Sequence, residues 1–141
     1  MSSGPVTVSA VFQVSLVVPD AASAPVEATL SYRVDDPYAV RIAFRTRQAA
    51  EAVEWTFARQ LLTDGVTAPA GAGDVRTWPS HSHGEPVVCL SLTSPSGTAL
   101  FELPVTGLVE FLTRTYAQVP TGGESQHVDL DRELAELLGP G

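Results

Sequence analysis

The sequence predicts an α+β fold in which antiparallel sheets pack with helices, in the order ββββα, then βββα, then a terminal helix. Apolar and polar residues alternate with a period of two over most of the first 57 residues, which is typical of half-buried strands. The connections between these segments are short, and short connections favour antiparallel pairing. Over residues 104–119 the apolar period changes to three and four, which indicates an amphipathic helix.

Four strands are expected in the first half of the chain, and turn formers separate them. They cover residues 6–18, 26–34, 38–47 and 51–57. The alternation places Tyr32 and Trp55 on the inward face of their strands. Residues 58–65 follow as a short helix, and Gly65 is expected to act as its C-terminal stop.

The second half repeats this pattern with fewer strands. A short strand at 74–79 precedes a hairpin of strands 86–93 and 98–103, followed by the helix at 104–119 and a terminal helix at 129–138. Pro104 suits the first turn of its helix, and residues 120–126 read as a loop. No linker divides the chain, so residues 1–141 are expected to form a single domain.

Composition and charge exclude several classes of protein. The chain has 141 residues, 44% of them hydrophobic, and a net charge of −8, which argues against nucleic acid or anionic membrane as a target of bulk attraction. Cys89 is the only cysteine, so no internal disulfide can form. The N-terminus lacks the pattern of a signal peptide and no apolar run is long enough to span a bilayer. A cytoplasmic protein is expected.

The stretch "WPSHSHG", residues 78–84, raises the question of a metal site. His81 and His83 are one residue apart, and zinc would need one or two further ligands from Glu85, Cys89 or the remote His127. No familiar spacing joins these residues. We therefore interpret the stretch as a surface loop rich in serine, glycine and proline, with no metal.

Catalytic patterns have structural explanations of the same kind. Cys89 lies in an apolar strand, where a cysteine behaves as a small hydrophobe rather than a nucleophile. Asp35 and Asp36 precede Pro37 and read as turn formers. The glycine-rich residues 69–74 lack the strand, helix and lysine of a phosphate-binding loop and read as a flexible turn. No enzymatic activity and no cofactor are expected.

Four segments together resemble one known family. They are "DDPYAVRIAF" (35–44), "VEWTFARQLLTDG" (53–65), "GAGDVRTWPSHSHGEPVVCLSLTSPSG" (71–97) and "HVDLDRELAELL" (127–138). In combination they are similar to the SsgA-like family of actinobacterial sporulation and cell-division proteins, particularly its SsgB-type members. The resemblance implies a fold like that of the Whirly-type and guide-RNA-binding proteins, assembled as homo-oligomers, with a trimer favoured.

The resemblance also implies a function. Members of this family control septation and spore formation, and SsgB-type members mark division sites and recruit or organise FtsZ, the tubulin-like division GTPase, with an SsgA-type partner. This chain is therefore expected to be a non-enzymatic scaffold at the cell septum. The candidate contact residues are the arginines on the outward face of the third expected strand and the two histidines: Arg41, Arg45, Arg47, His81 and His83.

Two other functions stay open from the sequence. The first is a single-stranded nucleic-acid-binding module, suggested by the fold analogy, although the acidic balance and the absence of lysine make nucleic acid an unfavourable partner. The second is an enzyme or metal protein that uses His81, His83 and Glu85.

Overall fold

The computed structural model describes residues 7–18, 22–45 and 52–124. Seven of the described segments are strands, and they form one antiparallel sheet in the order β4-β3-β2-β1-β7-β6-β5. The strands are β1 (Thr7–Leu16), β2 (Ala24–Arg33), β3 (Ala39–Arg45), β4 (Val53–Ala58), β5 (Val75–Ser82), β6 (Glu85–Ser94) and β7 (Gly97–Pro104). The helices of the described residues are α1 (Arg59–Gly65) and α2 (Val105–Gln118). The predicted terminal helix at 129–138 lies outside the described residues.

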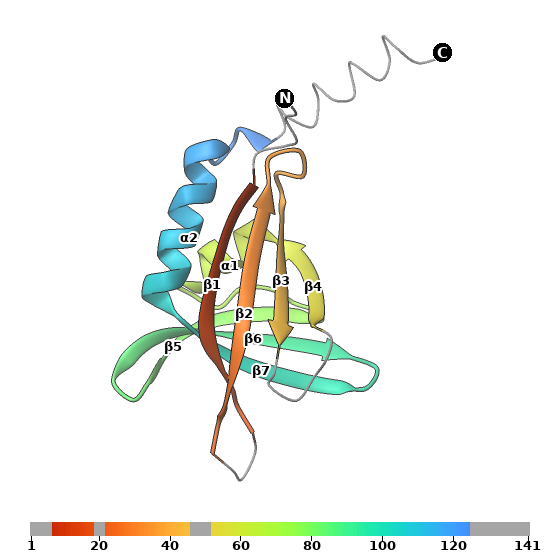
Figure 1. Ribbon diagram of the computed structural model, residues 1–141, viewed down its shortest axis with the longest axis vertical. Helices are drawn as coiled ribbons and strands as arrows, with labels where there is room; N and C mark the ends of the chain where they lie inside the picture. Colours follow the sequence, from red (N-terminus) through yellow and green to blue (C-terminus); the bar gives the residue numbers. More distant parts are fainter. Residues whose placement is uncertain (1–6, 19–21, 46–51, 125–141) are drawn as a thin grey trace.

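The sheet consists of two halves that cross steeply. Strands β1 to β4 run along the long axis of the molecule, whereas β5 to β7 run across it behind them (Figure 1). Within the described ranges, two residue pairs join β1 to β7, Ser15 with Glu102 and Leu16 with Phe101, and the Val17 N–H donates a backbone hydrogen bond to the Leu100 carbonyl oxygen. The expected separate sheets are thus one continuous sheet, because these few pairs, between segments far apart in the sequence, link the two halves.

The core fills the space between the two halves of the sheet. The inward positions of β2 and β3 face those of β6 and β7, as the alternation predicts. The fully buried side chains there include Leu30, Tyr32, Val40, Ile42, Val88, Leu90 and Leu103. Phe44 of β3 stacks on Phe101 of β7 with ring centroids 3.9 Å apart, so one aromatic pair joins the halves directly.

Helix α1 ends at Gly65 as expected and begins at Arg59, one residue later than predicted, but Gly65 has a different role from the one predicted. The backbone does not reverse there, since the following residue, Val66, is still in the right-handed helical region with φ −65°. A Cβ on Gly65 would collide with the side chain of Thr77 on β5. Glycine is required because α1 and β5 approach closely, and the Thr77 hydroxyl also donates to the Leu61 carbonyl oxygen across this contact, at 2.7 Å.

Helix α2 lies alongside β1 and closes one side of the core (Figure 1). It buries Leu108, Phe111, Leu112 and Thr115, which follow the predicted helical spacing. Pro104 is the residue before the first turn rather than within it, with φ −66° and ψ 129°. Its fixed φ suits the change from strand β7 to helix.

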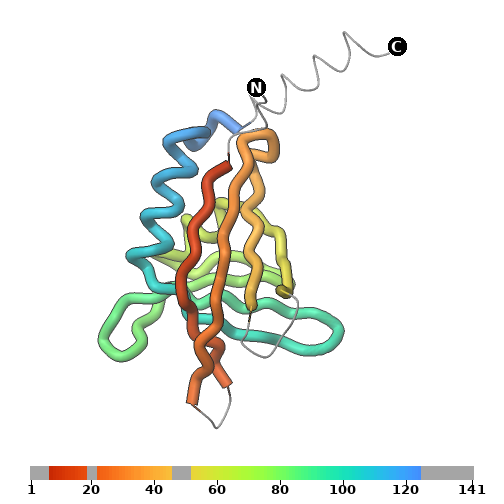
Figure 2. Tube along the Cα trace, in the orientation of Figure 1, coloured from red at the N-terminus to blue at the C-terminus, as the bar shows by residue number. Residues whose placement is uncertain are grey.

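The prediction that "WPSHSHG" forms a loop is wrong. Residues 78–82 continue β5, which runs eight residues from Val75 to Ser82, and His83 and Gly84 form a two-residue turn into β6. Both turn residues have positive φ, 53° at His83 and 80° at Gly84, as a type I′ hairpin turn requires. This hairpin projects from the body of the sheet (Figure 2).

Candidate interaction surfaces

The predicted arginine face lies on the outer surface of β3. Arg41 and Arg45 are exposed there, whereas Arg47 lies outside the described residues. Arg45 pairs across the ladder with Glu27 of β2, and Arg41 lies between Ser31 and Thr56. The surface is therefore polar and mixed in charge rather than uniformly basic.

The two histidines are both exposed but do not form a pair on one strand face. His81 occupies β5 opposite Pro86, and His83 occupies the hairpin turn. Among the residues that the structure describes, no group of three or more His, Cys, Asp and Glu side chains could hold a metal ion, and the third candidate ligand, His127, lies outside them. The hairpin is instead an accessible projection from the sheet.

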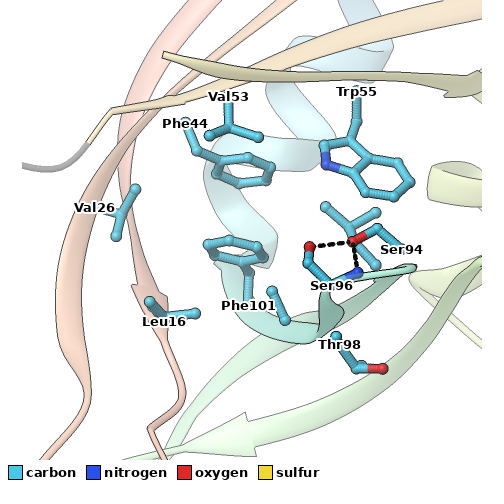
Figure 3. A pocket seen from close by; sticks show the side chains of 12 residues that line it. Leu16, Val26, Phe44, Val53, Trp55, Ser94, Ser96, Thr98 and Phe101 are labelled. Carbon is cyan, nitrogen blue, oxygen red and sulfur yellow. Dashed lines mark hydrogen bonds between the residues drawn. The ribbon is translucent and has the colours of Figure 1, made fainter. Parts of the chain in front are cut away.

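An apolar pocket of about 390 Å³ opens between the two halves of the sheet, beside the β6–β7 turn (Figure 3). Trp55 and Val53 of β4 form one wall, and the stacked rings of Phe44 and Phe101 lie beside them. The opposite wall is the hairpin from Leu92 to Ala99, and none of the described lining residues carries a charge.

This pocket can accept an uncharged, apolar group. The hydroxyls of Ser94 and Ser96 are 2.9 Å apart and hydrogen-bonded to each other, so they do not require a polar ligand. Val53 is 59% exposed, which leaves apolar surface accessible at the pocket. The alternation predicted an inward Trp55, but nothing local in the sequence indicated that the wall beside it would be open.

Arg59, which the sequence interpretation passed over, is the most unusual buried residue. Its side chain is 1% exposed, and its guanidinium lies 3.8 Å from the ring centre of Tyr116 and 4.8 Å from that of Tyr32. Nη1 donates to the Val119 carbonyl oxygen at 2.9 Å, and Nη2 pairs with the Glu124 carboxylate at 2.7 Å. Nε has no partner among the described residues. The cluster joins the start of α1 to the end of α2.

The Arg59 cluster has a structural rather than a catalytic geometry. The guanidinium is enclosed by two rings, and it is already paired with a carboxylate, so it is not available to an incoming anion. Burial raises the pKa of the Tyr32 phenol above its ordinary value, an effect that the Arg59 charge partly opposes. The Tyr32 hydroxyl donates to the Pro37 carbonyl oxygen at 3.0 Å.

Cys89 occupies the buried position that its apolar surroundings predicted. It is 5% exposed on β6. Burial raises the pKa of its thiol, the nearby Glu102 charge raises it further, and a hydrogen bond with Ser80 opposes both. A thiol in this state is a poor nucleophile.

No helix among the described residues is long and apolar enough to cross a membrane.

The described residues define an antiparallel α+β protein with one seven-stranded sheet and two helices. The family described as Streptomyces sporulation and cell division protein, SsgA, matches residues 26–124, and the chain belongs to this family. The sporulation-specific cell division protein SsgB of Frankia casuarinae is 56% identical over 135 residues, which cover 96% of this chain and 94% of the relative. The SsgB protein of Streptomyces coelicolor is 53% identical over 132 residues, which cover 94% of this chain and 96% of that relative.

Solved structures support the same relationship. The SsgA-like sporulation-specific cell division protein of Thermobifida fusca superposes with a TM-score of 0.88 at 48% identity, covering 98% of this chain and all of that one. A solved structure described by the words "Mutations in SsgB correlate to longitudinal cell division during sporulation of Streptomyces coelicolor" superposes with a TM-score of 0.84 at 50% identity. The match covers 90% of this chain and 99% of that one. The family resemblance and the α+β class are confirmed, whereas the likeness to Whirly-type proteins stays a prediction.

Proposed function

We propose that this chain is a non-enzymatic cell-division protein that recruits or organises FtsZ at the septum during sporulation. The observation that carries the proposal is similarity along nearly the whole chain to proteins named sporulation-specific cell division protein SsgB. The names of these relatives describe a division role and no catalytic activity. In this proposal the chain acts in the cytoplasm, at the cell septum, together with SsgA-type partners.

A homo-oligomer, with a trimer favoured, suits this function. An oligomer presents several copies of one weak site to a polymer such as FtsZ. The second and third contacts then form at a high effective concentration, which raises avidity without any new kind of contact. The candidate contacts within this proposal are the exposed Arg41 and Arg45 of β3, the exposed His81 and His83 of the β5–β6 hairpin, and Arg47, which lies outside the described residues.

Binding of single-stranded nucleic acid, the alternative prediction, gains little support from the β3 surface. A stacking platform needs exposed aromatic rings beside its cations. The cross-strand neighbours of Arg41 and Arg45 are Ser31, Thr56 and Glu27 instead. A carboxylate opposite one of two arginines weakens the attraction for phosphate.

Co-sedimentation with GTP-assembled FtsZ tests the proposal, with the oligomeric mass measured in parallel by light scattering. We expect the wild-type chain to pellet with the polymer as an oligomer, above a control without FtsZ. An oligomer that stays in the supernatant, both alone and with an SsgA-type partner, would contradict it. Replacing Arg41, Arg45 and Arg47 together by serine tests the contact through these arginines. Unchanged pelleting of this folded variant would show that FtsZ does not bind there.

A further inference from the structure

A second concave surface lies at the free edge of β5. We call it the β5-edge cleft, and its lining residues are Pro69, Ala70, Gly71, Arg76, Thr77, Trp78 and Pro79. Its volume is about 430 Å³, within the roughly 300–1,000 Å³ that specific ligand sites span. One wall is the segment after α1, which the sequence interpretation treated as a flexible glycine-rich turn, and the other is β5.

The two walls of the cleft are held together by backbone hydrogen bonds. The Ala70 N–H donates to the Thr77 carbonyl oxygen at 2.8 Å, and the Thr77 N–H donates to the Ala70 carbonyl oxygen at 3.0 Å. Gly71 has φ +91°, and a Cβ there would collide with the Val75 carbonyl oxygen. The cleft is thus formed before any ligand arrives, and its shape depends on a glycine at position 71.

The edge of β5 is closed to simple strand addition. The backbone groups of Thr77 point away from β6, since they bond to Ala70. The alternation of an antiparallel ladder turns Pro79 the same way, where it has no N–H to offer. An incoming segment therefore has to be recognised by side chains more than by continuous β pairing.

Arg76 supplies a cation that the described part of the chain leaves without a carboxylate. The two ion pairs found there are Arg33 with Asp35 and Arg59 with Glu124. Arg76 is exposed, and its cleft neighbours are Trp78 and two prolines. A cleft that combines a guanidinium with an indole and two proline rings complements a carboxylate that lies close to an aromatic or aliphatic side chain.

We infer that the β5-edge cleft binds an acidic segment of a partner protein, with a carboxylate on Arg76 and an apolar side chain against Trp78 and the prolines. The inference rests on the proposed function, since it gives that function a docking site. A nucleic acid strand also carries negative charge and rings that stack. It is the weaker candidate, because a phosphate chain is usually held by several cations and only one lines this cleft.

A fluorescence titration tests the inference with a defined probe. Trp55→Phe leaves Trp78 as the only tryptophan, so its emission reports on the cleft alone. The probe is the peptide acetyl-EEFEE-amide, and acetyl-KKFKK-amide is its charge-reversed control. We expect a saturable shift in Trp78 emission with the acidic peptide, with a Kd at or below about 1 mM, and no shift with the basic one.

Matched variants in the same background separate the cleft from general charge effects. Arg76→Ser should weaken peptide binding about tenfold, whereas Arg114→Ser, an equal charge change on α2, should leave it unaltered. Gly71→Ala should also weaken binding because it displaces one wall. Gly73→Ala is its control, since a Cβ there has nothing within 4 Å. Far-UV circular dichroism verifies that each variant is folded.

Three results would overturn the inference. They are no emission change up to about 5 mM peptide, equal losses with Arg76→Ser and Arg114→Ser, or tighter binding of an oligonucleotide of about ten thymidines than of the peptide. In the FtsZ sedimentation experiment Arg76→Ser should reduce pelleting. Peptide binding without pelleting of the wild-type chain would refute FtsZ as the partner and leave the cleft intact as a site.

Discussion

Replacing Arg59 by methionine should destabilise the protein more than any single surface change. The substitution keeps much of the apolar stem but removes the ion pair with Glu124, the hydrogen bond to Val119 and the contacts with the two tyrosine rings. Removing one partner of a buried ion pair costs about 3–5 kcal/mol. Because Glu124 is 13% exposed and keeps some contact with water, we take the lower end, about 3 kcal/mol.

Urea denaturation followed by tryptophan emission measures this loss, at one protein concentration for all variants. For a chain of this size, about 3 kcal/mol corresponds to a fall in Tm of about 10 °C. Arg114→Met is the matched control, because Arg114 is exposed and, among the described residues, donates a single hydrogen bond, to Ser9. The loss for this variant should stay within about 0.5 kcal/mol. A loss below about 1 kcal/mol for Arg59→Met would refute the reasoning.

Three further predictions concern Glu124, Cys89 and Gly65. Burial raises the pKa of the Glu124 carboxyl, but hydrogen bonds from Arg59 and from the backbone outweigh it and hold the pKa below its ordinary value. The stability that the ionised Glu124 side chain gives the folded protein is therefore complete above about pH 4.3 and is lost as the pH falls through the lower folded-state pKa. The urea midpoints of Glu124→Gln should therefore fall less steeply on acidification than those of the wild type. Cys89 should react with a maleimide at least about 100-fold more slowly in the native protein than in urea, and equal rates would contradict its burial. Gly65→Ala should cost about 1–3 kcal/mol through the collision with Thr77, and an unchanged urea midpoint would show that the helix can shift.

The local patterns of the sequence predicted most elements because alternation and helical spacing are visible within a few residues. Strand β2 is the clearest example, since Val26, Ala28, Leu30 and Tyr32 are all buried at the predicted parity. The joining of the halves into one sheet could not be predicted in this way. It depends on residues 15 and 16 pairing with 101 and 102, and nothing local marks a contact between segments so far apart.

The sequence was misleading where a residue's type suggested a different environment from the one that its position in the fold provides. Arg59 looks like an exposed residue by type, yet it lies three residues before the fully buried Leu62 and so on the same face of α1. That spacing was the available signal. The polar residues of "WPSHSHG" indicated a loop, but an edge strand needs little apolar alternation. The turn that ends this strand has positive φ at His83, a conformation that is uncommon for residues other than glycine.

The candidate surfaces could be predicted only in part. The outward position of Arg41 and Arg45 follows from strand parity, but the carboxylate of Glu27 opposite Arg45 depends on the pairing register of β2 with β3. The β5-edge cleft requires the segment after α1 to return against Thr77, which is a tertiary contact. Gly71 was visible in the sequence as a turn residue, whereas its role in bringing the two walls together was not.

The most direct test of the central claim is the position of the protein in dividing cells. A fluorescent fusion of this chain would be expressed in a Streptomyces coelicolor strain that lacks its own SsgB, a relative 53% identical to this chain, together with a second label on FtsZ. We expect regularly spaced bands of the fusion that coincide with FtsZ rings, and restored septation. Diffuse fluorescence of an intact fusion, in cells where FtsZ still forms no regularly spaced rings, would contradict the proposed role in recruiting FtsZ.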